Sequence, residues 1–168
     1  GENAEETISH ALKLDYPDFE VIAINDGSSD NTGEVLDRLA EKFDKLRVVH
    51  LAQNQGKAMG LQAGSLMTDA EFLIGIDGDA LLDPHAAKWM IRHFLADEKI
   101  AAVTGNPRIR TRSTLLGRIQ VGEFSSIVGM IKRAQRVFGR LFTVSGVITA
   151  FRKSAVHEVG YWSPNMLT

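Results

Sequence analysis

Two short acidic segments carry residue types that bind divalent cations and nucleotides. Asp77 and Asp79 flank Gly78 directly after an apolar run, and Asp26 follows another apolar run. Carboxylates at i and i+2 on a turn can converge on one hard cation, because the glycine between them lets the backbone bend. A Mg²⁺ or Mn²⁺ ion held by few protein ligands keeps open positions for phosphate oxygens. The pattern therefore predicts a metal and diphosphate site.

Calcium is the first alternative for the acidic turn, and it does not fit. An EF-hand loop that began at Asp77 would need glycine at its sixth position and glutamate at its twelfth. The chain has Leu82 and Lys88 there. The alternative that each acid only caps a following helix stays open, for Asp26 above all.

Basic residues near these acids suggest contacts with phosphate. Lys57 stands at a strand-to-helix turn, where a lysine can meet a phosphate, although a solvated lysine is an equal alternative. The GxxxxGK[ST] and GxGxxG patterns are absent. Arg108, Arg110 and Arg112 alternate and suit phosphate or acceptor contacts, or else form an ordinary basic face.

Several other chemistries are excluded by residues that the chain lacks. It has no cysteine, and its five histidines show no metal-ligand spacing, so we assign no histidine site. A GxSxG motif is also absent, which argues against a serine hydrolase. Nucleic acid is a poor partner, because aromatic residues are not interleaved with the arginines.

Charge is distributed unevenly along the 168 residues. Residues 1–100 hold 9 basic and 19 acidic residues, whereas residues 101–168 hold 10 basic and 2 acidic ones. The net charge of the whole chain is only −2. This asymmetry suggests an anionic partner for the second part. With 44% hydrophobic and 24% charged residues, the chain is expected to be globular.

Apolar runs and amphipathic stretches alternate in the first part, as in βα units on a mostly parallel sheet flanked by helices. Strands are predicted at 21–24, 47–51, 72–76, 100–103 and 142–151. A helix is predicted at 32–43, capped by Asn31. A second carries Gly56, Gly60 and Gly64 on one bare face that could pack closely on a strand. A third has Asp83 as its cap and Pro84 as its first helical residue. We expect Phe43 and Leu95 to be buried on these helices.

Beyond the fourth strand the pattern changes to one long helix at about 113–136. Its apolar stripe includes Ile119, Ile131 and Phe138 and is expected to be part of the core, whereas its basic end suits an anionic lipid surface. No linker interrupts the chain, so we predict one domain over residues 1–168, with a nucleotide-binding half (1–104) and an acceptor-side half (105–168). No apolar run approaches the roughly 18 residues that span a bilayer, so the chain is expected to be soluble.

Several motifs, in this order, resemble those of family 2 glycosyltransferases. They are 21–30 (VIAINDGSSD), 54–58 (NQGKA), 76–80 (IDGDA), 104–108 (TGNPR) and 144–152 (VSGVITAFR). The segments 105–113 (GNPRIRTRS) and 120–126 (QVGEFSS) are most similar to the processive bacterial synthases that polymerise N-acetylglucosamine.

The resemblance implies a GT-A fold, a Rossmann-like α/β architecture, and inverting transfer of N-acetylglucosamine from UDP-N-acetylglucosamine to a growing β-linked exopolysaccharide of the biofilm type. Asp26 matches the acid that contacts uracil, and Lys57 a lysine near the diphosphate. Asp77 and Asp79 match the DxD pair that meets Mg²⁺ or Mn²⁺. The acceptor-side segment contains Ser145 and Gly146.

The resemblance also implies that the family pattern extends past both ends of this chain. A first strand is expected before residue 1, and the aspartate that serves as general base is expected just after Thr168. The 168 residues are therefore expected to transfer little or no sugar, since a positioned base contributes about 100- to 10,000-fold. The longer protein would sit at the cytoplasmic face of a bacterial inner membrane, with partner subunits.

Two alternatives to this interpretation remain at the level of sequence. A sugar-1-phosphate nucleotidyltransferase also carries metal-binding acids on an α/β sheet, although its glycine-rich start is not visible here. A non-catalytic domain that binds a UDP-sugar is the other.

Overall fold

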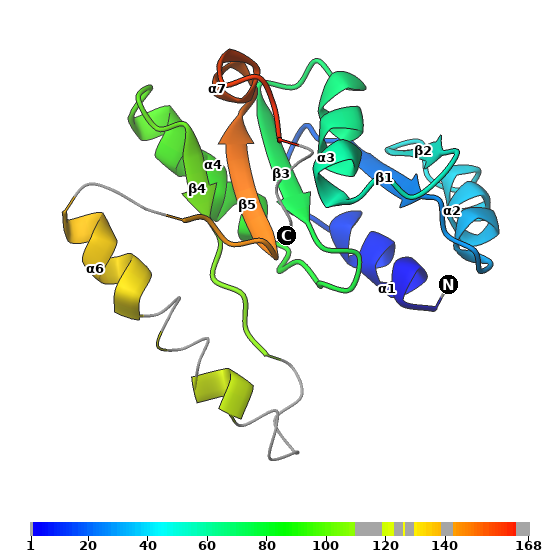
Figure 1. The fold of residues 1–168 in the computed structure, drawn as a ribbon, viewed down its shortest axis with the longest axis horizontal. Coiled ribbons are helices and arrows are strands. Elements are labelled where there is room, and N and C mark those ends of the chain that lie inside the picture. Colours follow the sequence, from blue (N-terminus) through cyan, green and yellow to red (C-terminus); the bar gives the residue numbers. More distant parts are fainter. Residues whose placement is uncertain (1, 110–118, 123–125, 127–129, 139–142, 164–168) are drawn as a thin grey trace.

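The structure is a computed structural model that describes residues 2–109, 119–122, 126, 130–138 and 143–163. The helices and strands alternate along the first part of the chain (Figure 1). In chain order they are α1 (Glu2–Ala11), β1 (Val21–Asp26), α2 (Thr32–Ala40), β2 (Leu46–Leu51), α3 (Lys57–Leu66), β3 (Phe72–Ile76), α4 (Ala86–Ala96), β4 (Ala102–Thr104), α6 (Lys132–Val137), β5 (Ile148–Arg152) and α7 (Lys153–Glu158).

The strands form two hydrogen-bonded groups. Strands β1 and β2 pair in parallel, with Asn25 opposite His50 and Asp26 opposite Leu51. Strand β5 lies between β3 and β4 and runs antiparallel to both. Because β3 and β4 both oppose β5, they run in the same direction. Each of the segments predicted as a strand overlaps one of these strands, and the α/β prediction is confirmed.

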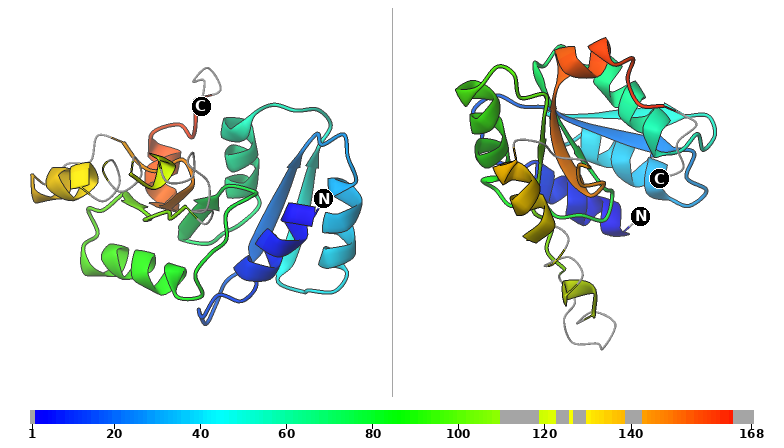
Figure 2. Two further views of the ribbon diagram at one scale, coloured as in Figure 1. Left: turned by 90° about the horizontal axis from the view of Figure 1, so that it is seen from below. Right: turned by 60° about the vertical axis from the view of Figure 1, so that its left-hand side comes forward.

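Two apolar cores hold the helices against these strands. One lies between α1, α2 and the parallel pair, and its buried residues are Ile8, Ala23, Val35, Leu36, Leu39 and Leu46. The other packs α4 on the antiparallel group through Met90, Ile91, Phe94 and Ala150. Figure 2 shows α1 and α2 beside β1 and β2, and α4 beside the second group. Burying each large side chain contributes about 1.5 to 3 kcal/mol.

Helix α3 packs its glycine face on β1, as predicted from the spacing. A Cβ atom at Gly60 would lie 3.5 Å from the Ile24 side chain, and one at Gly64 would lie 3.4 Å from it. The absence of side chains on this face therefore lets the helix approach the strand closely, which brings Lys57, at its first turn, close to the ends of the strands.

Two helices differ from the prediction at their ends. Helix α2 ends at Ala40, and Phe43 is 41% exposed instead of buried. Its first turn is capped through Asp30, whose Oδ1 accepts the Thr32 N–H at 3.1 Å, and not through the Asn31 side chain. The prediction that Leu95 is buried is wrong. Leu95 is 73% exposed near the end of α4, because the buried face of that helix is formed by other residues, Phe94 among them.

Helix α4 also begins later than predicted. Asp83 and Pro84 precede it, and Asp83 Oδ1 accepts the His85 N–H at 2.8 Å, one residue before the first helical residue Ala86. Asp83 therefore caps a turn that leads into the helix.

The predicted long helix at 113–136 is described only in part. Residues 119–122 are helical and α6 covers Lys132–Val137, while most of the remaining span lies outside the described residues. The expectation that its stripe is core is wrong where it can be checked, because Ile119, Ile131 and Phe138 are 53%, 45% and 84% exposed. Helix α6 extends outward from the antiparallel group (Figure 1), and its first residue, Lys132, lies against Thr104 at the end of β4. Within the described residues, no helix has the length and apolar character needed to cross a membrane.

Candidate functional site

The predicted acidic and basic residues gather where β1 and β3 end. Asp26 is the last residue of β1, Lys57 is the first of α3, and Asp77 directly follows β3. In open α/β sheets this edge is where ligands bind.

Lys57 joins three parts of the chain. Its ammonium group forms an ion pair with Asp77 Oδ1, and it also donates to the Gly146 carbonyl at 2.5 Å. Both side chains of the ion pair are about one third exposed, at 33% for Lys57 and 32% for Asp77. The cation is therefore fixed between the end of β3 and the segment that leads into β5, and it remains accessible to an anionic ligand.

Gly146 reaches this position because β5 is antiparallel. Ile148 pairs with Ile76, so the residues just before β5 lie beside the end of β3. The Asp77 N–H donates to the Val147 carbonyl at 3.1 Å, which extends the pairing by one step. The resemblance assigned Ser145 and Gly146 only to an acceptor-side segment, which stays a prediction. The direction of β5 is the physical reason why Gly146 lies beside Lys57.

Asp26 binds the turn that precedes Lys57. Its two carboxylate oxygens accept the Gln55 N–H at 2.7 Å and the Gly56 N–H at 2.8 Å. A carboxylate oxygen has two acceptor positions, so each oxygen can still accept one further hydrogen bond. Asp26 therefore does not cap the helix that follows it, since α2 begins at Thr32 and Asp30 accepts the Thr32 N–H. It holds the turn before α3, and it keeps the capacity to accept a donor group from a ligand.

The turn after Asp26 packs tightly against the same loop. Gly27 has a φ of +65°, and a Cβ there would lie 2.5 Å from the Asn54 backbone nitrogen. Only glycine suits both conditions. The turns after β1 and β2 are therefore in direct backbone contact.

Asp77 and Asp79 lie on one turn, which is fastened to α1 by a hydrogen bond from Thr7 Oγ1 to the Gly78 carbonyl at 2.9 Å. Asp79 is exposed, and Asp77 is paired with Lys57. In the part of the chain that the structure describes, no group of three or more His, Cys, Asp or Glu side chains could hold a metal ion. Two carboxylates fit a Mg²⁺ or Mn²⁺ ion that takes its remaining ligands from phosphate and water.

Ser145 lies near a buried cation. The Ser145 N–H donates to Thr104 Oγ1 at 2.9 Å, and Lys132 Nζ lies 3.5 Å from the same oxygen. Lys132 is only 8% exposed, and burial lowers its pKa. Arg108 is exposed, and Arg110 and Arg112 lie outside the described residues.

Sequence reasoning missed the residues that hold the site together. Asn25 and His50 are hydrogen-bonded to each other at the base of the Asp26 turn, and Thr7 holds the acidic turn. The position of Asn25 at the end of a buried strand was the one available signal, because a buried amide must find partners.

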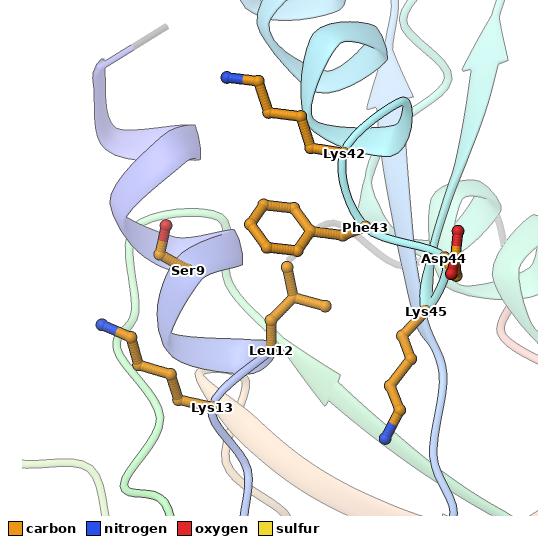
Figure 3. Close-up of a pocket in the computed structure, with 7 residues that line it drawn as sticks. All are labelled: Ser9, Leu12, Lys13, Lys42, Phe43, Asp44 and Lys45. Carbon is orange, nitrogen blue, oxygen red and sulfur yellow. The ribbon is translucent and has the colours of Figure 1, made fainter.

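A cavity of about 460 Å³ lies elsewhere, between the end of α1 and the loop that enters β2. Its lining residues are Ser9, Leu12, Lys13, Lys42, Phe43, Asp44 and Lys45 (Figure 3). Lys45 precedes β2, and its carbonyl accepts the N–H of Val21, the first residue of β1. The cavity therefore lies at the opposite end of these strands from Asp26.

Comparison with known proteins gives one family and a set of relatives. The family model described as "Glycosyl transferase family 2" matches residues 1–160. The poly-beta-1,6-N-acetyl-D-glucosamine synthase of Staphylococcus epidermidis is 45% identical over 167 residues, and that of Staphylococcus aureus strain N315 is 46% identical. In both cases 99% of this chain matches, and it spans 40% of the relative's length.

Solved structures share the fold at lower sequence identity. The mannosyltransferase PcManGT from Pyrobaculum calidifontis, in complex with GDP-Man and Mn²⁺, has a TM-score of 0.73 and 22% identity, over 98% of this chain and 45% of its own. S. aureus TarS 1-349 in complex with UDP has a TM-score of 0.66 and 17% identity, over 96% and 46% of the two chains. The predicted GT-A-like architecture is confirmed by these neighbours.

Proposed function

The chain belongs to glycosyl transferase family 2, and from this we propose that it forms the donor-binding part of an inverting, metal-dependent transferase that takes N-acetylglucosamine from UDP-N-acetylglucosamine. The observation that carries the proposal is the meeting of Lys57, Asp77 and the Gly146 carbonyl at the ends of the strands. It puts one accessible cation and an acidic turn where a nucleotide diphosphate is expected in an α/β sheet.

Four residues contact the donor or its metal ion in this proposal. Asp26 accepts a hydrogen bond from the uracil while it holds the Gln55 and Gly56 amides. Lys57 contacts the diphosphate, and Asp79, with Asp77, holds a Mg²⁺ or Mn²⁺ ion. The ion, when bound, neutralises the negative charge that develops on the leaving UDP.

The second part of the chain is proposed to face the acceptor. Gly146 lies beside Lys57 because β5 is antiparallel, and Ser145 is the residue before it. Exposed Arg108 precedes the arginines at 110 and 112. We propose that this side meets a growing β-linked polysaccharide, in keeping with the names of the bacterial relatives. For the longer protein we propose a place at the cytoplasmic face of the inner membrane, with partner subunits.

Calorimetric titration with UDP and with UDP-N-acetylglucosamine tests the proposal. The general base that the family resemblance implies is not assigned to any residue here, so binding is the right readout. We expect binding with Mn²⁺, weaker binding with a chelator, and at least tenfold weaker binding of GDP than of UDP.

The matched variants are Asp79→Ala and Asp69→Ala. Asp69 is also exposed but precedes β3, at the opposite end of that strand. Only Asp79→Ala is expected to remove the effect of Mn²⁺. If UDP binding is the same with chelator as with Mn²⁺, or the same in Asp79→Ala as in the unaltered chain, the metal and diphosphate assignment is wrong.

A further inference from the structure

A line of four polar groups runs from the turn after β1 to helix α2. The Ser28 N–H lies 3.1 Å from Asn25 Oδ1, Asn25 Nδ2 lies 3.0 Å from His50 Nδ1, and His50 Nε2 lies 2.9 Å from Asp37 Oδ1. Asn25 is 8% exposed, while the His50 and Asp37 side chains are 42% and 62% exposed. The line thus begins at a buried amide and ends at the surface.

The hydrogen-bonding capacities of these groups allow one arrangement of protons. The Ser28 N–H can only donate, so the Asn25 oxygen must face it and the Asn25 amino group must face His50. His50 Nδ1 must then accept, which leaves the ring proton on Nε2, where the Asp37 carboxylate accepts it. Each donor along the line meets an acceptor only in the neutral Nε2–H tautomer of His50.

The surrounding elements enforce this contact. Asn25 and His50 are direct partners in the parallel pairing of β1 and β2. Gly33 of α2 faces them, and a Cβ there would lie 3.1 Å from Asn25 Nδ2 and 3.6 Å from the His50 ring. Among the described residues, Asp37 is the charged group in contact with the ring, and the β1 partner is neutral.

The buried amide acts on the proposed donor site through one short turn. Asn25 Oδ1 closes the turn 25–28, which contains Asp26 and the backbone of Gly27 that abuts Asn54. The direction of the Asp26 carboxylate toward the Gln55 and Gly56 amides depends on this turn. Reorientation of the Asn25 amide would therefore shift the carboxylate of Asp26, the residue assigned to uracil, although Asn25 itself contacts no ligand.

We propose that Asn25 and His50 are positioning residues for donor binding, and that the Nε2–H tautomer of His50 holds the Asn25 amide in the orientation that shapes the Asp26 turn. This inference rests on the proposed function for its effect on nucleotide affinity. The hydrogen-bond arrangement itself stands apart from that function.

The first test is a long-range ¹H–¹⁵N correlation spectrum of the 168-residue chain at neutral pH, with the His50 signals assigned by comparison with His50→Leu. We expect Nε2 to carry the proton and Nδ1 to be unprotonated. The Nδ1–H tautomer, or a ring protonated on both nitrogens, would overturn the proposal.

The second test is amide exchange at Ser28. His50→Leu removes the acceptor of the Asn25 amino group, so we expect Ser28 to exchange about tenfold faster. His50→Asn places an amide oxygen at the position of Nδ1 and is expected to restore protection, although it cannot reach Asp37. His10→Leu, on α1, is the control. Equal exchange in all these variants would overturn the arrangement.

The third test is the affinity for UDP. We expect about tenfold weaker binding in His50→Leu, recovery in His50→Asn and no change in His10→Leu. If the unaltered chain binds UDP and His50→Leu binds it equally well, the positioning role is wrong and the proposed function survives. If the unaltered chain does not bind UDP, the proposed function fails, and the tautomer and Ser28 exchange still decide the arrangement.

Asn25→Asp keeps the test decisive if His50→Leu does not fold. The substitution preserves shape and the acceptor for Ser28, but it places a carboxylate against Nδ1, so the ring then lies between two carboxylates. We expect Nδ1 of His50 to carry a proton in this variant, because a carboxylate can only accept a hydrogen bond there. A neutral ring with an unchanged spectrum would contradict the proposed contact.

Discussion

The ammonium group of Lys57 is paired with the carboxylate of Asp77, so that α3 and β3 are joined at the edge where both acidic segments lie. The same cation binds the Gly146 carbonyl. A ligand that takes over one of these contacts changes the others, which makes Lys57 the residue whose replacement has the clearest consequences.

Lys57→Met is expected to have opposite effects on nucleotide and metal. A hydrogen bond to a charged group contributes about 1.5 to 3 kcal/mol, so UDP affinity should fall about 10- to 100-fold. Mn²⁺ affinity without nucleotide should rise, because the competing ammonium beside Asp77 is gone. Calorimetry measures both. Lys88→Met is the control. It removes an exposed ion pair in which Lys88 Nζ lies 2.6 Å from Asp15 Oδ2, and it should change neither affinity.

Asp26→Ala is expected to weaken uridine binding and to leave Mn²⁺ affinity unchanged. The substitution frees the Gln55 and Gly56 amides and removes the proposed acceptor for the base, so the loss should be tenfold or more. Titration with uridine, with UDP and with Mn²⁺ alone checks this division. Equal losses for nucleotide and metal would contradict it.

A series of three glycines separates backbone strain from steric clash at the site. Gly27→Ala should destabilise the fold by about 2 to 4 kcal/mol, because a positive φ and a contact of 2.5 Å with Asn54 act together. Gly56 has open space around it, but its φ of +85° and ψ of 164° are adopted almost only by glycine, so Gly56→Ala should cost about 1 to 3 kcal/mol. Gly78→Ala has open space and no positive φ, and it should be nearly neutral. Urea unfolding at neutral pH gives the order.

Asp15 makes part of the stability depend on pH. The hydrogen bond from Lys88 lowers the pKa of Asp15 from its usual 3.8, and the charges of Lys88 and His85 add to this effect. Because the folded-state pKa is the lower one, the stabilisation is present above pH 3.8 and is lost as the pH falls through the folded value.

In the unaltered chain the free energy of unfolding should fall as the pH is lowered below about 4, because Asp15 is protonated and its pair with Lys88 is lost. Lys88→Met should make this fall smaller. Thermal unfolding at a series of pH values measures it. Lys42→Met, in the loop after α2, provides a lysine control that is not paired with Asp15. If the free energy of unfolding falls equally at low pH in the unaltered chain and in Lys88→Met, the pair does not contribute to stability.

Local sequence patterns determined which segments form strands and where two of the acids lie, although helix α1 was not predicted. Short apolar runs predicted every described strand, and glycines four residues apart predicted the face of α3 that packs on Ile24. The acids Asp26 and Asp77 were assigned to strand ends from local sequence alone. These features depend on near neighbours in the chain, so composition and spacing suffice to find them.

The direction of β5, and everything that follows from it, was decided by the tertiary structure. The sequence of residues 148–152 does not indicate that this strand runs antiparallel to β3. The antiparallel direction nevertheless brings Gly146 to Lys57, which is 89 positions away in the sequence. Likewise, His50 has no motif around it, and its role arises from pairing with Asn25 across two strands. Hydrogen bonds between distant segments depend on the register and direction of packed strands, and a linear pattern does not carry that information.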